Sequence, residues 1–177
     1  MRVLVCFASR HGATEDVART IGARLELRGL NVDVRNVTDV GSLDGYAAVV
    51  IGSAVYMNDW EQTARALVLS QEQRLREQPV WLFSTGPVGE PLFPEEESKE
   101  ALWLAEKIAA KGHVTFPGKL DHHDLSLIER LTVAIVHAKD GDYRDWEAID
   151  GWADEIADDL VANTLAYEAA ALASEDR

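Results

Sequence analysis

The sequence predicts an α/β fold in which a parallel sheet lies between two layers of helices. Short apolar runs alternate with longer segments of helical period along the chain. Several of these runs are continuously apolar, which is typical of strands that are buried on both faces. Short polar loops join the runs to the helical segments, and such connections place successive strands in parallel.

The first half of the chain is expected to supply three strands and one helix. Residues 3–8 and 47–51 are continuous apolar runs, and residues 31–37 alternate between polar and apolar side chains, as in a half-exposed strand. A helix is expected to begin at Thr14 and to stop at Gly29. Its apolar side chains fall four residues apart, at Val17, Ile21 and Leu25.

The second half continues the alternation. Asp59 is expected to cap a helix, with Gln62 in the capping-box position, and Pro79 is expected to end it. The remaining elements are expected at 80–83 (strand), 95–111 (helix), 113–120 (strand, interrupted at Pro117 and Gly118) and 146–163 (helix).

We expect one domain over residues 1–177, with two additions to the alternating pattern. Residues 121–145 form an extra segment, which contains an apolar stretch of helix length at 125–137. An Ala-rich tail from residue 164 extends the last helix or frays from it. The single Cys6 excludes an internal disulfide, and its place within an apolar run predicts a buried, inert thiol.

The net charge of the chain limits the classes of partner that it can bind. The chain has 17 lysines and arginines against 31 aspartates and glutamates, a formal net charge of −14. We therefore expect no nucleic-acid partner and no docking on anionic membranes. No apolar run approaches the length that spans a bilayer, and the apolar start is too short for a signal peptide, so we expect a cytoplasmic protein.

The loop between the first strand and the first helix is the sharpest functional signal. A helix N-terminus offers free backbone N–H groups and a positive dipole end, which together bind anions. Ser9 and Thr14 add hydroxyls, and Gly12 lets the backbone approach a ligand closely. No lysine follows the glycine and no G-x-G-x-x-G is present, so a monophosphate fits better than a nucleoside triphosphate or a dinucleotide. An ordinary strand-to-helix turn stays open as the alternative.

The run from Phe7 to Thr14 resembles the phosphate loop of the flavodoxin-like family. Within that family, the chain is most similar to the menaquinone-dependent protoporphyrinogen dehydrogenases. They share a similar loop, a similar strand end at 49–53 and a similar helix start at 145–147. The resemblance implies a doubly wound, five-stranded parallel sheet in the order 2-1-3-4-5, with helices on both faces and a bound FMN.

Carried over residue by residue, the resemblance implies three cofactor-binding loops. The phosphate would be held by Ser9, Arg10, His11, Gly12, Ala13 and Thr14. The flavin ring would be bordered by Ser53, Ala54, Val55 and Tyr56 on one side and by Ser84, Thr85, Gly86, Pro87, Val88 and Gly89 on the other. Asn58 suits a positive φ in a loop through which such proteins tune the flavin. Tyr56, Trp60 and Phe93 are stacking candidates, with plain packing as the alternative for each.

These observations predict an FMN-binding oxidoreductase that oxidises or reduces a small organic substrate, with porphyrinogen or quinone chemistry implied by the resemblance. The extra segment at 121–145 favours an enzyme, because it could build a chamber over the flavin. A one-electron carrier that docks a redox protein, and a binding protein for a deazaflavin, are the alternatives. An oligomer stays open. The ligand-type residues at 121–124 predict a solvated turn and not a metal site.

Overall fold

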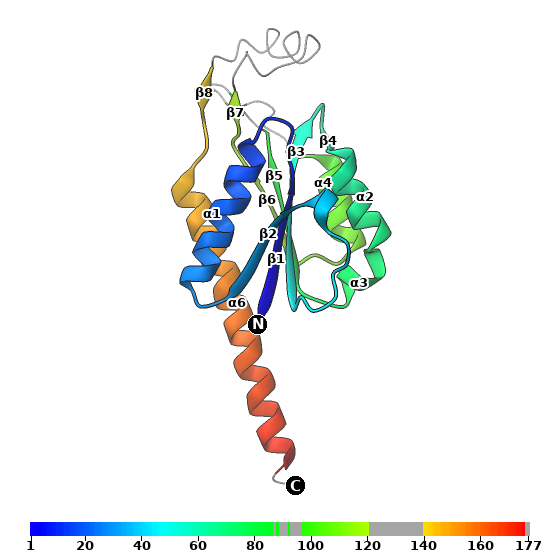
Figure 1. Ribbon diagram of the computed structural model, residues 1–177, viewed down its shortest axis with the longest axis vertical. Coiled ribbons are helices and arrows are strands. Elements are labelled where there is room, and N and C mark those ends of the chain that lie inside the picture. The colour runs from blue at the N-terminus through cyan, green and yellow to red at the C-terminus, as the bar shows by residue number, and fades with distance from the viewer. Residues whose placement is uncertain (87, 89–91, 93–96, 121–139, 176–177) are drawn as a thin grey trace.

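A twisted sheet runs through the centre of the computed structural model (Figure 1). The structure describes residues 1–86, 88, 92, 97–120 and 140–175. Five strands pair in parallel in the order β2-β1-β3-β5-β6, and short β4 pairs antiparallel with the end of β3. With β4 set aside, this is the predicted order. The strands are β1 (Arg2–Ala8), β2 (Asn31–Asn36), β3 (Ala48–Tyr56), β4 (Asp59–Trp60), β5 (Val80–Thr85) and β6 (Gly112–Phe116).

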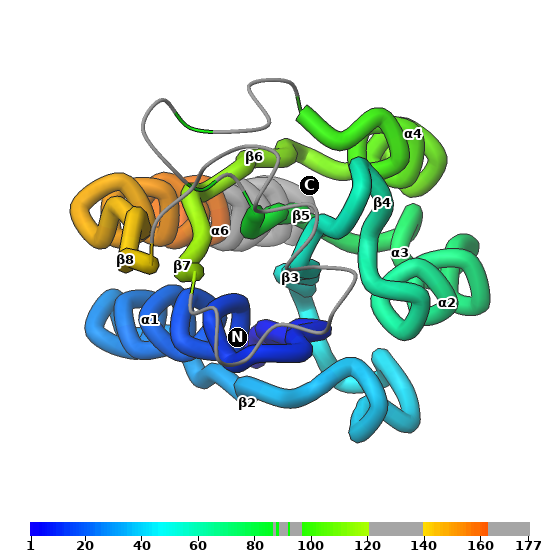
Figure 2. Tube along the Cα trace, turned by 90° about the horizontal axis from the view of Figure 1, so that it is seen from above, coloured from blue at the N-terminus to red at the C-terminus, as the bar shows by residue number. Residues whose placement is uncertain are grey.

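Helices cover both faces of the sheet, as Figure 2 shows from above. α1 (Ala13–Leu27) and α6 (Trp146–Glu175) lie on one face, and α2 (Gln62–Ser70), α3 (Glu72–Arg76) and α4 (Lys99–Lys107) lie on the other. A 3₁₀ turn, η1 (Val37–Asp39), follows β2. Successive residues of the central strands enter opposite layers, so Leu4 and Cys6 pack under α2–α4 while Val3 and Val5 pack under α1 and α6.

An aromatic cluster fills the layer under α6. The ring centroids of Phe83 and Phe116 lie 6.3 Å apart, and Trp152 of α6 lies 6.1 and 5.8 Å from them. The fully buried ring of Phe83 also lies over Gly52 of β3, where a β-carbon would stand 1.9 Å from Phe83 Cζ. Phe83 and Phe116 are almost fully buried, and each contributes about 1.5–3 kcal/mol of burial free energy. Partly buried Trp152 packs α6 against them.

The expected helix start at Asp59 was wrong. Asp59 pairs with Tyr56 in a hairpin, and α2 begins at Gln62, with Glu61 at the N-cap and no side-chain cap. The Glu61 N–H donates instead to the Ser53 hydroxyl (2.9 Å) and to the Ala54 carbonyl (3.3 Å), which turns the chain back onto β3. Tertiary pairing therefore overrode a local capping signal. The single helix expected up to Pro79 is also divided at Gln71 into α2 and α3.

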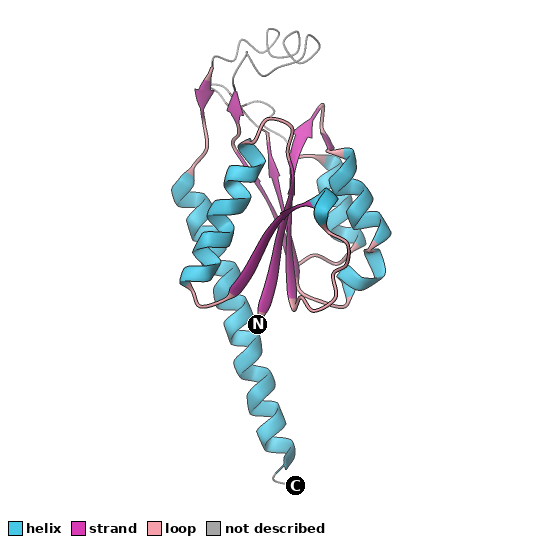
Figure 3. Cartoon of the chain, viewed as in Figure 1, coloured by secondary structure: helices cyan, strands magenta, loops and turns pink. Residues whose placement is uncertain are grey.

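The last part of the chain forms a hairpin base and a long helix (Figure 3). As expected, the strand after α4 breaks at Pro117 and Gly118, and the chain resumes as β7 (Lys119–Leu120), paired antiparallel with β8 (Gly141–Asp142). The segment between them, 121–139, lies outside the described residues, and with it lie the expected apolar stretch and the 121–124 turn. The Ala-rich tail continues α6 to Glu175.

Ion pairs hold α6 to α1. Arg24 donates to both carboxylate oxygens of Asp154 (2.9 and 2.6 Å), and Arg28 bonds Asp154 and Asp158. The hydrogen bonds from Arg24 and Arg28 lower the pKa of Asp154 to about 2. Within the described part of the chain, α6 included, no helix combines the length and the apolarity needed to cross a membrane.

Candidate functional site

The three predicted loops begin side by side at one edge of the sheet. Ala8 of β1 pairs with Ser53 of β3, and Ser53 pairs with Ser84 of β5. The strand order reverses at β1: β2 lies on one side of it, and β3, β5 and β6 lie on the other side. Ligands of open α/β sheets bind at such a reversal, beyond the carboxyl ends of the strands.

The N-terminus of α1 has no side-chain cap. Gly12 is its N-cap, with φ 82° and no side-chain cap, and the first N–H bonded within the helix is that of Asp16, which donates to the Gly12 carbonyl at 3.0 Å. By contrast, the Ser98 hydroxyl caps α4 by accepting from the Ala101 N–H at 3.2 Å. The leading N–H groups of α1 therefore have neither a partner within the helix nor a side-chain cap, and such groups can bind an anion.

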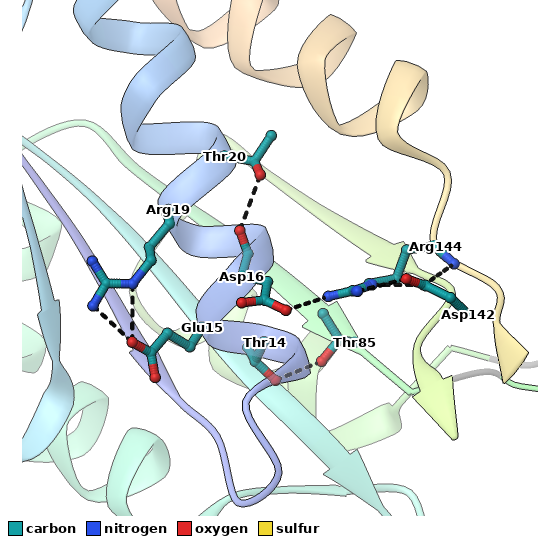
Figure 4. A network of polar contacts seen from close by, with 8 residues as sticks. All are labelled: Thr14, Glu15, Asp16, Arg19, Thr20, Thr85, Asp142 and Arg144. Atoms are coloured by element: carbon teal, nitrogen blue, oxygen red, sulfur yellow. Dashed lines mark hydrogen bonds and ion pairs between the residues drawn. The ribbon is translucent and has the colours of Figure 1, made fainter. Parts of the chain in front are cut away.

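A buried hydrogen bond joins the first loop to the third. The hydroxyls of Thr14 and Thr85 lie 2.7 Å apart, and both side chains are almost fully buried (Figure 4). Thr14 belongs to the first turn of α1 and Thr85 ends β5. The two loops that were predicted to hold opposite ends of the cofactor are therefore fixed to one another by their own side chains.

Replacing Thr14 by valine should lower the free energy of unfolding by about 1–3 kcal/mol, because the buried Thr85 hydroxyl loses its partner. It should also weaken FMN binding, since Thr14 lies in the candidate phosphate loop. Urea unfolding and flavin fluorescence titration measure the two effects. The Thr14→Val/Thr85→Val double variant should cost less than the sum of the single variants, and simple additivity would show that the bond contributes nothing.

The first loop also contacts the second. Arg10 Nε lies 2.5 Å from Glu61 Oε1, and the Arg10 guanidinium stacks 4.5 Å from the centre of the Tyr56 ring. The His11 ring meets Tyr56 edge-on at 6.3 Å. These contacts gather the predicted residues Arg10, His11 and Tyr56 at the same edge of the sheet.

The second loop is a two-residue hairpin turn. Met57 and Asn58 have φ of 51° and 74°, so the expected positive φ at Asn58 is confirmed, and Met57 shares it. Two positive φ values characterise the tight turn that matches strand twist. Contacts from α4 fasten the turn: Ser98 donates to the Asn58 carbonyl at 2.5 Å, and the Trp60 N–H donates to Glu100 at 2.7 Å.

Two of the predicted site residues, Ser53 and Ser84, already form hydrogen bonds within the protein. The Ser53 hydroxyl donates to the Ala54 carbonyl at 2.9 Å, and the Ser84 hydroxyl accepts from the Trp60 indole N–H at 2.8 Å. Trp60 is 4% exposed, which favours packing over stacking on a ligand. Val55, which lies between Ser53 and Trp60 in the sequence, is partly buried and packs against the core. Among the third-loop residues, Gly86 and Val88 are described, whereas Pro87, Gly89 and Phe93 lie outside the described residues.

Sequence reasoning missed His113, which completes a buried polar chain. Its Nε2 lies 2.8 Å from the Ser84 hydroxyl, and its Nδ1 lies 3.6 Å from Glu97. The Ser84 hydroxyl accepts from the Trp60 indole N–H and forms a second hydrogen bond with His113 Nε2, so it links the two rings. Burial lowers the pKa of His113 below its usual 6.5, although the Glu97 carboxylate opposes the shift.

The stability of the protein should therefore fall as the pH drops below about 6.5, because the unfolded chain then takes up a proton that folded, neutral His113 does not. This loss should continue down to the lowered pKa of the folded state. Urea unfolding at about pH 7.5 and about pH 5.5 measures it for the wild type and for His113→Gln. The variant should lose less stability over this interval, and equal losses would refute the role of His113.

The single cysteine, Cys6, is buried in β1. Burial raises the pKa of Cys6 to about 12, so its thiol stays protonated, as predicted. No group of three or more metal-ligating side chains occurs within the described ranges.

The comparisons with known proteins agree with this geometry. The model of the family described as "Flavodoxin domain" matches residues 4–147. The chain is 23% identical over 174 residues to the protoporphyrinogen IX dehydrogenase [quinone] of Escherichia coli (strain K12), covering 89% of this chain and 95% of that protein. Among solved structures, the Streptococcus pneumoniae TIGR4 flavodoxin superposes with a TM-score of 0.60 at 17% identity, covering 90% of this chain and 99% of that one.

The rubredoxin oxygen:oxidoreductase of Desulfovibrio gigas also superposes, with a TM-score of 0.65 at 15% identity over 91% of this chain. This chain spans only 36% of that larger protein, so the likeness concerns one part of it. The family match over most of the sequence, the strand order and the helix end at the reversal point lead to one conclusion. The chain belongs to the flavodoxin domain family and is a flavodoxin-type redox protein, whose fold implies a flavin cofactor.

Proposed function

We propose that the protein binds FMN non-covalently, with the phosphate at the N-terminus of α1 and the flavin ring between the second and third loops. The uncapped first turn at Gly12 carries this proposal, because backbone N–H groups at a helix N-terminus suit a phosphate. The hydrogen bond between Thr14 and Thr85 supports it by holding the phosphate loop against the end of β5.

Each loop has a separate task in this proposal. Residues 9–14 bind the phosphate through N–H groups and hydroxyls, and a monophosphate matches the single helix end. Tyr56 offers an aromatic face at the site, and the backbone of residues 54–58 and 85–86 offers polar groups to the ring edge. FMN would supply the electron-transfer chemistry, while these residues orient it and control access to it.

The visible spectrum of the purified protein tests the proposal. Flavin absorption bands, together with the mass of FMN in the released cofactor, are the expected result. A released deazaflavin would redirect the proposal to that cofactor. A colourless protein that fails to bind added FMN would refute it.

We further propose that the protein is an enzyme acting on a small organic substrate of the porphyrinogen or quinone type. The β7–β8 hairpin supports this, because its base adjoins the third loop: a β-carbon at Gly118 would stand 3.5 Å from the Gly86 backbone. The similarity to protoporphyrinogen IX dehydrogenase [quinone] extends through this region and over 95% of that protein.

Replacing residues 121–139 by a short Gly-Ser linker, with β7 and β8 kept, tests the role of the hairpin segment. An enzyme should lose turnover of protoporphyrinogen IX with a quinone while its bound flavin still reacts with a small artificial acceptor. The matched control is an equal linker length inserted after Gly41, whose exposed loop lies at the opposite end of β3. Unchanged turnover would show that the segment does not serve the reaction.

An electron carrier is the second candidate, favoured by the net charge of −14, which suits docking on a basic redox partner. A carrier should reduce or oxidise such a protein at a rate that falls steeply with ionic strength, and it should show no turnover of porphyrinogen or quinone. The two measurements together separate the candidates.

A further inference from the structure

Two carboxylates occupy the first turn of α1, the helix to which the phosphate is assigned. Glu15 and Asp16 suit the helix dipole, but their charge opposes a phosphate at the same helix end. Each carboxylate is paired with an arginine (Figure 4). Arg19 bonds Glu15 at 2.9 and 2.7 Å, and Arg144 Nη1 donates to Asp16 Oδ2 at 2.8 Å.

The two arginines differ in how firmly they are held. Arg19 lies along the same helix, and its side chain is 62% exposed. Arg144 is only 6% exposed and donates to both oxygens of Asp142, at 2.7 and 2.6 Å. Its guanidinium also stacks 4.4 Å from the centre of the Trp146 ring. Asp142 and Trp146 therefore fix the Arg144 guanidinium in one geometry, whereas Arg19 keeps the freedom of a surface side chain. The Asp16 carboxylate itself is 57% exposed, so its interaction with Arg144 is strongest at low ionic strength.

Arg144 also joins two distant parts of the fold. Asp142 belongs to β8, and the neighbouring Tyr143 N–H donates to the Gly118 carbonyl at 3.1 Å. Asp16 lies four residues along α1 from Gly12, or about 6 Å of helix axis. The guanidinium therefore connects the base of the β7–β8 hairpin with the turn that begins the phosphate site.

We propose that Arg144 is a positioning residue of the phosphate site. It offsets part of the charge of Asp16, which shares the guanidinium with Asp142, and it holds the first turn of α1 against the hairpin base. It thereby favours the phosphorylated flavin over riboflavin. This inference rests on the proposed FMN function. It assigns no direct contact between Arg144 and the cofactor, because its three charged contacts are with Asp16 and Asp142.

Fluorescence titration of the cofactor-free protein with FMN and with riboflavin tests the inference at low ionic strength. Arg144→Gln should weaken FMN binding about five- to tenfold, because it leaves Asp16 uncompensated, and should leave riboflavin binding within about twofold. Adding Asp16→Asn to Arg144→Gln should restore FMN affinity to within about threefold of the wild type. Arg19→Gln is the matched control, and its effect should be no more than about twofold.

Equal losses of FMN and riboflavin affinity in Arg144→Gln, or no recovery on adding Asp16→Asn, would reduce Arg144 to a structural tie and overturn the inference. If Arg144→Gln does not fold, as judged by circular dichroism, Asp16→Asn alone decides. It should bind FMN at least as tightly as the wild type, and weaker binding overturns the inference. A wild type that binds neither flavin would instead refute the proposed function.

Discussion

Replacing Gly52 by alanine is expected to destabilise the protein by about 3 kcal/mol or more. The added β-carbon would stand 1.9–2.4 Å from three ring atoms of Phe83, which is far inside van der Waals contact. The ring has little room to move, because Phe116 and Trp152 pack against it. Urea unfolding measures the loss.

Two further variants sharpen this prediction. Gly41→Ala is the matched control, since a β-carbon there meets nothing within 4 Å, and its stability should stay within about 1 kcal/mol of the wild type. Phe83→Leu should relieve part of the Gly52→Ala clash, so the double variant should cost less than the sum of the two changes. A Gly52→Ala protein with wild-type stability would contradict the packing described for Phe83.

Replacing Gly12 by valine is expected to weaken FMN binding at least about tenfold and to cost about 1–2 kcal/mol of stability. The cause is the backbone φ of 82°, which a β-branched residue adopts only with strain. The protein itself leaves open space at this position, since a β-carbon added to Gly12 would meet nothing within 4 Å. No protein atom blocks the side chain, so we expect the loss of FMN affinity to come from the strained backbone of the loop that would hold the phosphate.

Gly45→Val is the matched control for this experiment. Gly45 has a φ of 80° and equally open surroundings, but it lies in the loop before β3 and not in the phosphate loop. It should lose similar stability and keep its affinity for FMN. Parallel fluorescence and urea titrations compare the two variants. Equal FMN affinities in both would remove Gly12 from the phosphate site.

The parallel sheet could be predicted because strands that are buried on both faces are continuously apolar in sequence. Residues 3–8 and 80–83 are continuous apolar runs, and both are strands that lie almost fully within the core. The turn that opens α1 was predicted in the same way, from Gly12 and Thr14, and the structure confirms it, whereas the phosphate at this turn stays a prediction. In both cases the physical cause of the structure is local.

Features that depend on distant partners could not be predicted in this way. Asp59 satisfied a local capping pattern, yet it lies in β4, where the adjacent Trp60 bonds Ser84 and Glu100, which are 24 and 40 residues away. His113 reaches Ser84 across 29 residues, and Arg144 reaches Asp16 across 128. Nothing adjacent to Arg144 in the sequence indicates that its guanidinium is buried or that α1 receives it. The chain has 31 aspartates and glutamates, so the carboxylate that pairs with a given arginine cannot be identified from the sequence.

The structure also has a cleft of about 560 Å³ that was not predicted from the sequence. It lies between α1 and the edge strand β2 and is lined by Phe7, Glu15, Arg19, Val32, Asn36 and Asp39, among others. This cleft is an alternative binding site for the flavin, because it also borders α1. It lies beside β2, whereas the second and third loops follow β3 and β5 on the other side of β1.

The most direct test of the central claim, that FMN binds where the three loops meet, is an amide NMR titration of the cofactor-free protein with FMN. We expect the largest shifts at the amides of Gly12, Ala13 and Thr14, followed by those of residues 54–58 and 85–86. Riboflavin should reproduce the shifts of the second and third loops but not those at 12–14. Shifts centred on Val32, Asn36 and Asp39 would place the flavin in the cleft beside β2 and contradict the claim.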